Sequence, residues 1–204
     1  MGMLGNIRRI SALVQDDMEE HLGDIAVLKM DAASMRPRAE HRPALEALAD
    51  YAPELDLDAL AELPAGSFGR EVARFMTEHV LSPFVITEAI EPEMRRRNAL
   101  GIRIAQTHDL LHVLAGFDTS WPGEMGVYAV QVAQRWSWLS PILGLTTWLV
   151  YPFLSGFRIG ELRAAWRRGL DIGARAPFLL GERLEDRFAE PLSDVRASYG
   201  IPAP

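Results

Sequence analysis

Apolar residues recur at intervals of three and four along most of the chain, the spacing that gathers them on one face of an α-helix. The stretches that follow this spacing best are residues 16–35, 43–51, 67–81, 91–115, 156–170 and 182–198, and a further helix starts near Pro122. Residues 57–64 form a short helix or a loop. Alternating apolar and polar residues, which indicate strands, are rare. We therefore predict an all-α fold: a compact single-domain bundle of about seven helices over residues 1–204.

Residues that favour helix ends mark where several of these helices begin and stop. Ser67 suits the N-cap of the helix that follows it. Gly116 suits the left-handed position after the 91–115 helix, and Pro122 suits the first turn of the next one. The loop between these two helices is therefore short, and we expect them to pack against each other.

Residues 136–157 carry no charged side chain, although Arg135 and Arg158 stand at either end. A run of about 20 apolar residues is long enough to span a bilayer. The prolines and glycines at 141, 144, 152 and 156 predict a break into two shorter helices. Three interpretations follow: a buried hairpin of helices, a surface that dips into a bilayer or lines a lipid pocket, and a transmembrane helix.

Composition narrows the possible chemistry. The formal net charge is -7, which argues against nucleic acid as a partner, because phosphate binding needs a basic surface. There is no cysteine, so disulfides, thiolate metal sites and cysteine nucleophiles are excluded. The first residues lack the basic start and apolar run of a secretory signal, so we expect a cytoplasmic protein.

Two histidines and an aspartate share one turn of the predicted 91–115 helix. At about 100° per residue, with His108 at zero, His112 falls near 40° and Asp109 near 100°. Histidines four residues apart can present two imidazoles to one metal ion. Asp109 adds a carboxylate ligand or orients a ligand histidine. Glu124, at the start of the next helix, returns toward His112 when the two helices pack antiparallel. The pattern predicts a divalent metal site.

The same helical face carries small residues above and below the histidines. Gly101, Ala105, Ala115 and Gly116 all project within about 80° of His108. Missing bulk beside polar ligands predicts a cavity for a substrate. Arg103 projects to the opposite side, so we do not expect it to contact the metal.

Each of these features also has a purely structural explanation. A His-Asp pair is often structural, and the distant ligands that complete a nucleotide phosphohydrolase site are not recognisable. Glu124 is also the acid that a helix dipole favours in a first turn. His21, His41 and His79 stand apart from the cluster and are predicted to be surface or packing residues.

At the histidine motif the chain resembles the ubiquinone (coenzyme Q) biosynthesis protein 4 family, whose signature is His-Asp-x-x-His followed by eleven residues and Glu. His108, Asp109, His112 and Glu124 match this signature. The resemblance covers about residues 57–201, and the first 50 residues diverge. Further matching segments are Leu63–Arg70, Gly123-Glu124, Arg175-Ala176-Pro177, Glu182-Arg183, Pro191-Leu192 and Gly200-Ile201.

The resemblance implies an all-helical, peripherally membrane-associated homo-oligomer that acts with other ubiquinone biosynthesis proteins. The implied activity is C1 decarboxylation of a polyprenylated 4-hydroxybenzoate-type precursor, in some accounts coupled to hydroxylation. The implied metal is Zn2+, held by His108, Asp109, His112 and Glu124 as catalytic ligands, with Fe2+, Mn2+ and Mg2+ left open. The uncharged stretch, with Leu145 and Leu149, is the predicted groove for the prenyl tail. Two alternatives are a non-catalytic prenyl-lipid-binding scaffold and a divergent metal hydrolase.

Overall fold

The computed structural model describes residues 3–16, 21–49, 51 and 53–204, and this part of the chain is mainly helical. It contains no β-strand, only the isolated bridges Pro37–Ser137 and Ser67–Pro191. The all-α prediction is confirmed, but the described helices are shorter and more numerous than the seven expected. The α-helices are α1 (Met3–Asp16), α2 (Leu22–Ala32), α3 (Arg42–Glu46), α4 (Leu57–Ala61), α5 (Phe68–Glu78), α6 (Pro92–Arg97), α7 (Ala99–Ala115), α8 (Trp121–Ala133), α9 (Ser140–Leu154), α10 (Ile159–Arg175) and α11 (Leu192–Ser198).

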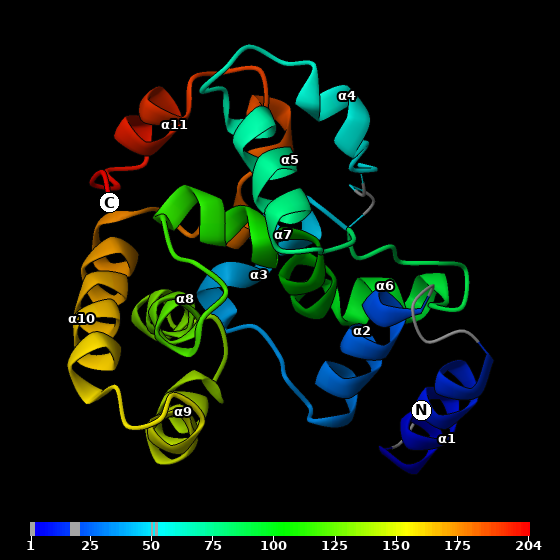
Figure 1. Cartoon of the computed structure of the whole chain (residues 1–204). Helices are drawn as coiled ribbons and strands as arrows, with labels where there is room; N and C mark the ends of the chain where they lie inside the picture. Colours follow the sequence, from blue (N-terminus) through cyan, green and yellow to red (C-terminus); the bar gives the residue numbers. More distant parts are fainter. Residues whose placement is uncertain (1–2, 17–20, 50, 52) are drawn as a thin grey trace.

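Helix α7 runs through the middle of the molecule, and the other helices pack around it (Figure 1). Helices α5 and α11 contact it above, α2 and α6 contact it on one side, and α8 lies on the other. Helices α9 and α10 pack on α8, while α1 packs on α2. Residues of α7 enter both apolar clusters of the core, which explains why this helix is apolar on nearly all faces.

A buried asparagine divides the helix predicted over 91–115. Asn98 leaves the helical conformation, with φ -118° and ψ 35°, so α6 ends before it and α7 begins after it. Its side-chain amide donates a hydrogen bond to the Val27 carbonyl at 3.0 Å, which ties this junction to α2. The predicted end of the helix is confirmed, because Gly116 adopts the left-handed conformation with φ 66°.

Other predicted helices are shifted or shortened. The 16–35 prediction covers the end of α1 and all of α2, and residues 17–20, Met18 among them, lie outside the described residues. Ser67 is confirmed as the N-cap of α5, since its side chain accepts a hydrogen bond from the Arg70 amide. The helix predicted over 43–51 is only the short α3, and the 57–64 stretch contains α4.

The uncharged stretch forms one helix, so the predicted break into two is wrong. In α9, Pro141 sits in the first turn, where proline is tolerated, and Pro152 lies in the last turn. The buried-hairpin interpretation is also wrong, because α9 buries only Ser140, Gly144 and Thr147. No helix in the described ranges is long and apolar enough to cross a membrane. Large apolar side chains exposed in and around α9 are Trp138, Ile142, Leu145, Leu149, Val150, Phe153, Leu154 and Phe157.

The last predicted helix, residues 182–198, is not one continuous α-helix. A 3-10 turn over Leu184–Arg187 is followed by Pro191, and α11 begins only after that proline. The fully buried pair Arg103–Glu185, 2.8 Å apart, holds the 3-10 turn against α7. Arg103 also donates hydrogen bonds to the carbonyls of Leu180 and Glu182. The conformation of this segment is therefore set by its contacts with Arg103, although its apolar spacing predicts an α-helix.

Candidate metal centre

The tight connection between α7 and α8 brings the predicted ligands together. Gly116 ends α7, and Ser120 caps α8 by accepting a hydrogen bond from the Gly123 amide. Five residues, Gly116 to Ser120, separate the two helices, so Glu124 in the first turn of α8 lies back against the last turns of α7. The chain thus places a carboxylate beside two imidazoles through local helix-end chemistry.

His108, His112 and Glu124 form the cluster that is able to hold a metal ion. Their ligand atoms all lie within 4.8 Å of one another. His108 Nε2 is 3.5 Å from one Glu124 carboxylate oxygen, and His112 Nε2 is 3.3 Å from the other. Two imidazoles and one carboxylate are a donor set that divalent zinc, iron and manganese accept.

The burial of His112 is the observation that tests whether this donor set fits a metal. Its side chain is only 1% exposed. Neither ring nitrogen makes a hydrogen bond to the described part of the protein, because the approach to Glu124 is poorly aligned. A buried polar group left unsatisfied costs about 1–3 kcal/mol. A divalent ion between His112, His108 and Glu124 would satisfy it, so the residues fit a metal.

The charges in the cluster shift the pKa values of two of its members. Burial alone would lower the pKa of His108, but its contacts with Asp109 and Glu124 outweigh that effect and raise it to about 9. Burial would raise the pKa of Glu124, but its contacts with His108 and His112 lower it to about 2. In the metal-free protein at neutral pH, His108 therefore carries a proton between two carboxylates. A metal ion would have to displace that proton.

Asp109 stands outside the three-residue cluster and contacts His108 from the other side of the ring. One of its carboxylate oxygens lies 3.2 Å from His108 Nδ1, whereas Nε2 of the same ring faces Glu124. A carboxylate in this position orients a ligand histidine and fixes which nitrogen is free to bind a metal. In this structure Asp109 thus has the geometry of an orienting group.

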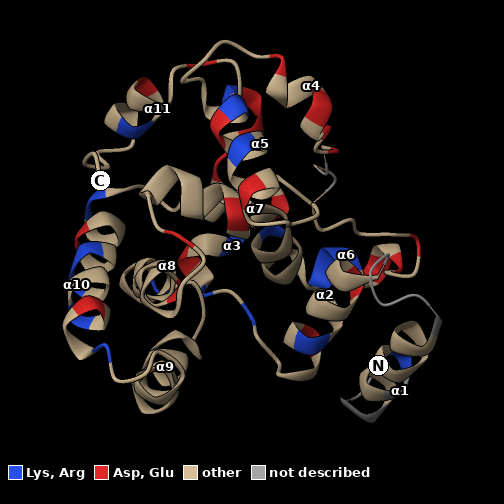
Figure 2. Cartoon of the chain, in the orientation of Figure 1, with Lys and Arg blue, Asp and Glu red and all other residues tan. Residues whose placement is uncertain are grey.

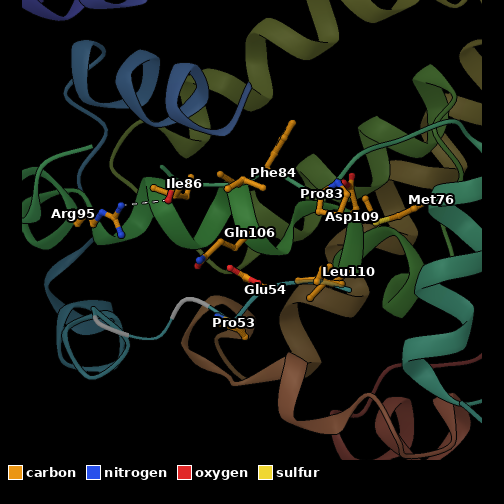
Figure 3. A pocket seen from close by; sticks show the side chains of 13 residues that line it. Pro53, Glu54, Met76, Pro83, Phe84, Ile86, Arg95, Gln106, Asp109 and Leu110 are labelled. Atoms are coloured by element: carbon orange, nitrogen blue, oxygen red, sulfur yellow. Dashed lines mark hydrogen bonds between the residues drawn. The ribbon is translucent and has the colours of Figure 1, made fainter. Parts of the chain in front are cut away.

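A cavity of about 570 Å³ opens on the flank of α7 that carries Asp109. Figure 3 shows Gln106, Asp109 and Leu110 on α7, between the loop of Phe84 and Ile86 and the segment of Pro53 and Glu54. Arg95 lines the cavity, but its guanidinium donates hydrogen bonds to loop carbonyls, including those of Thr87 and Ile90. The remaining lining is mostly apolar: Pro53, Leu55, Met76, Pro83, Phe84, Val85, Ile86, Ala105 and Leu110.

The small residues predicted to clear a pocket lie in different places. Ala105 lines the large cavity, and Gly116 borders a smaller one of about 380 Å³ that His112 also touches. The Asn98 side chain fills the space beside Gly101, and Ala115 is packed in the core. On α9, Leu145 and Leu149 are 62% and 63% exposed and lie at the surface.

The other histidines and Arg103 make packing contacts. His41 stacks on Phe178 with ring centroids 3.8 Å apart, His79 hydrogen-bonds Thr119, and His21 lies 3.0 Å from Asp24. Arg103 points away from the cluster into its ion pair with Glu185.

Three aromatic residues beside Glu124 are not among the site residues predicted from the sequence. They are Trp121, Tyr128 and Tyr151. Burial and the Glu124 charge both raise the pKa of Tyr128, and burial, Tyr128 and Glu124 raise that of Tyr151. The spacing of Tyr128, one turn after Glu124, was a signal available in the sequence, whereas Tyr151 reaches the site only through the packing of α9.

Fold and cluster together define a class: an all-α protein whose two histidines and one carboxylate, able to hold a metal ion, meet where α7 turns into α8. Residues 39–204 match the protein family described as "Coenzyme Q (ubiquinone) biosynthesis protein Coq4". The chain belongs to that family, which ties it to ubiquinone biosynthesis, and the match begins upstream of the resemblance seen at residue 57.

The curated relatives agree with this assignment. The chain is 32% identical over 160 residues to the mitochondrial ubiquinone biosynthesis protein COQ4 homolog of Rattus norvegicus, covering 74% of this chain and 56% of that protein. The Homo sapiens homolog is 30% identical over 165 residues, with the same coverage of 74% and 56%. The chain thus spans about half the length of the curated relatives it matches.

The fold also resembles a crystal structure from Nostoc punctiforme, provisionally described as a ubiquinone biosynthesis protein. The TM-score is 0.66 at 24% identity, over 99% of this chain and 97% of that one. This likeness supports the fold alone.

Proposed function

We propose that this chain binds one divalent metal ion and removes the C1 carboxyl group of a polyprenylated 4-hydroxybenzoate-type precursor of ubiquinone. His108, His112 and Glu124 would hold the ion, most suitably Zn2+, with Asp109 orienting His108. The observation that carries the proposal is the buried His112: neither ring nitrogen has a hydrogen-bond partner in the described structure, and Nε2 lies 3.3 Å from a Glu124 carboxylate oxygen. Family membership supplies the pathway.

Decarboxylation requires that negative charge developing on the aromatic ring be stabilised. When carbon dioxide leaves, the electron pair of the broken carbon-carbon bond stays on C1. A bound divalent ion supplies Lewis-acid stabilisation of such charge. The ring carbon then takes up a proton, or, where dioxygen accepts two electrons and becomes hydrogen peroxide, a hydroxyl group from water. Asp109 and Glu124 keep both histidines oriented throughout, since each contacts an imidazole nitrogen.

The test is a direct assay with purified, metal-stripped protein. A prenylated 4-hydroxybenzoate is supplied with Zn2+, Fe2+, Mn2+ or Mg2+ in turn, with and without dioxygen, and the product is identified by mass. We expect the decarboxylated ring with at least one ion, carrying hydrogen or hydroxyl at C1, and no product from His112→Ala. A metal-loaded protein that never consumes the substrate would contradict the proposal.

A second candidate function is a non-catalytic prenyl-lipid-binding scaffold for other ubiquinone biosynthesis proteins. The exposed apolar face of α9 favours it, because a surface of this kind binds lipid or a partner without needing chemistry. This reading predicts that lipid binding and complex assembly survive His112→Ala. Homo-oligomer formation also remains a prediction from family resemblance.

We further propose that the chain acts at a membrane surface, with α9 toward the lipid. Helix α9 is free of charge along its whole length in Figure 2, whereas the neighbouring α10 carries several arginines. Exposed Arg163 and Arg167 lie on α10, and Arg38 stacks over Trp138 at 4.0 Å. An apolar helix bordered by arginines and aromatic rings suits the interface of an anionic bilayer.

A further inference from the structure

One stripe of α8 joins the metal cluster to two aromatic side chains. Trp121, Glu124 and Tyr128 occupy positions i, i+3 and i+7, which fall on the same face of a helix. Trp121 opens the helix and is 41% exposed, while Tyr128 is partly buried. The carboxylate of the cluster therefore has an aromatic ring one turn before it and a phenol one turn after it.

Tyr151 of α9 completes an aromatic wall with these two residues. Its ring lies edge-on to Trp121 at a centroid distance of 5.1 Å and edge-on to Tyr128 at 6.2 Å. Both phenols lie close enough to the Glu124 carboxylate for its charge to raise their pKa values. The wall thus stands beside Glu124, and Leu154, one turn after Tyr151 on α9, is an exposed apolar side chain.

The two tyrosine hydroxyls are available to a ligand. Neither hydrogen-bonds another residue of the described chain, although both side chains are partly buried. A tyrosine that serves only as packing needs no hydroxyl. A hydroxyl held near a carboxylate and left without a protein acceptor is suited to donate to an acceptor on a bound molecule.

We infer that Trp121, Tyr128 and Tyr151 form the binding wall for an aromatic carboxylic acid, with the tyrosine hydroxyls donating hydrogen bonds to its ionised carboxyl group and Trp121 packing on its ring. This inference rests on the proposed function, because it names the substrate head group of that site. The substrate's apolar tail would leave along the exposed face of α9. The tyrosines are positioning residues that present the carboxyl group to the cluster.

The experiment compares binding of two ligands to metal-free protein by calorimetry. One is 3-prenyl-4-hydroxybenzoate, and the other is the phenol that lacks its carboxyl group. Hydrogen bonds to a charged group are worth about 1.5–3 kcal/mol, which is roughly tenfold or more in Kd. We expect wild-type protein to bind the acid at least about tenfold tighter than the phenol. The double variant Tyr128→Phe/Tyr151→Phe should lose that preference and keep its affinity for the phenol.

Both substitutions keep the ring, so the aromatic packing and the fold are preserved, which circular dichroism and Tm would verify. Tyr199→Phe, at a buried tyrosine on the C-terminal side of the molecule, is the matched control and should leave the preference unchanged. Equal preference for the acid in wild type and double variant would overturn the inference, as would wild-type protein that binds no acid. Because no turnover is measured, acid binding through the tyrosines without decarboxylation would count against the proposed function alone.

Discussion

At the scale of single residues, the two carboxylates of the candidate site, Glu124 and Asp109, make different contacts with the histidines. Glu124 lies across from both imidazoles, within 3.5 Å of His108 and 3.3 Å of His112. Asp109 touches only His108, and on the nitrogen that does not face Glu124. The two acids should therefore respond differently to substitution, although both belong to the same motif.

Measuring the metal affinity of variants should distinguish a residue that binds the metal from one that only orients a ligand. We expect His112→Ala and Glu124→Gln to abolish stoichiometric metal binding, because each removes a donor from a set of three. Asp109→Asn should retain the metal with an affinity about 10–100-fold lower, as is typical when an orienting carboxylate is lost. Titration with Zn2+ under a competing chelator measures this, and Glu46→Gln, at an exposed residue of α3, is the control. If Asp109→Asn binds no metal at all, Asp109 is itself a ligand.

The pH dependence of the metal-free protein follows from the two shifted groups. The raised pKa of His108, about 9 against an ordinary 6.5, stabilises the fold fully below pH 6.5, and this contribution is lost as pH rises through 9. The lowered pKa of Glu124, about 2 against 4.5, contributes above pH 4.5 and is lost as pH falls toward 2. The cluster is therefore most stabilising between about pH 4.5 and 6.5.

Urea denaturation of wild type and His108→Gln, with a chelator present, tests this sign. The difference in the free energy of unfolding between the two should be largest near pH 6 and should shrink by pH 9.5. A difference that grows with pH would mean that His108 is neutral in the folded protein. Excess Zn2+ should instead stabilise wild type more strongly as pH rises, because the ion competes with the His108 proton.

At the scale of elements, close backbone contact sets the relation between α8 and α10. A Cβ placed on Gly169 would lie 2.1 Å from the Gly126 carbonyl oxygen, and one placed on Gly173 would lie 2.8 Å from that of Val130. The two helices approach each other through these glycines. This contact supports α8, and so it indirectly holds Glu124 in place.

Two glycine substitutions in the same helix should have opposite effects. Gly169→Ala should destabilise the protein by about 1–3 kcal/mol, because a backbone carbonyl of α8 must move away. Gly160→Ala, in the first turn of α10 with no atom within 4 Å of the added Cβ, should be neutral or stabilise by up to about 1 kcal/mol. Thermal and urea unfolding measure both. Equal effects would contradict a close backbone contact between α8 and α10 at Gly169.

The Arg103–Glu185 pair is the element-scale link between α7 and the 3-10 turn over Leu184–Arg187. Both side chains are almost fully buried, at 1% and 2% exposure. Arg103→Ala should lower the free energy of unfolding by about 3–5 kcal/mol, because it leaves Glu185 charged and unpaired in the interior. Arg163→Ala on the exposed face of α10 is the control and should change stability little. The double variant Arg103→Met/Glu185→Leu should recover much of the loss, measured by urea unfolding.

At the scale of the whole molecule, charged and apolar surfaces are segregated. Charged residues lie along α5, α6 and α10, whereas α9 has none (Figure 2). Tyr151 connects this apolar surface to the aromatic residues beside Glu124. A substrate with a lipid tail could thus reach the cluster from the side of α9 without its tail crossing a charged surface.

Vesicle binding tests the orientation of the molecule at a membrane. Leu149→Glu/Phe153→Glu should reduce binding to vesicles of anionic phospholipid by more than about tenfold, since burying one such side chain contributes roughly 1.5–3 kcal/mol. Val85→Glu, at an exposed apolar residue distant in sequence from α9, is the matched control and should bind normally. Equal loss in both variants, or no loss in either, would contradict lipid contact through α9. A change from oligomer to monomer without loss of vesicle binding would mean that a second copy covers this face.

The sequence alone determined the fold class and the ends of the two helices that carry the motif. Helical periodicity, the Ser67 N-cap and the Gly116 terminus arise from interactions among residues three to five apart, so they are readable locally. The association of His108 and His112 is equally local. Glu124 was predictable because a short loop leaves two consecutive helices few ways to pack.

Only the tertiary structure decided whether each helix face is buried against another part of the chain or exposed to solvent. The tertiary structure breaks the predicted 91–115 helix at Asn98, turns residues 184–187 into a 3-10 segment under Arg103, and leaves α9 exposed although it is the most apolar stretch of the chain. It also brings Tyr151 to the cluster from a distant helix. Burial and long-range pairing depend on partner surfaces from elsewhere in the chain, and periodicity reports only that a face is apolar, not whether anything covers it.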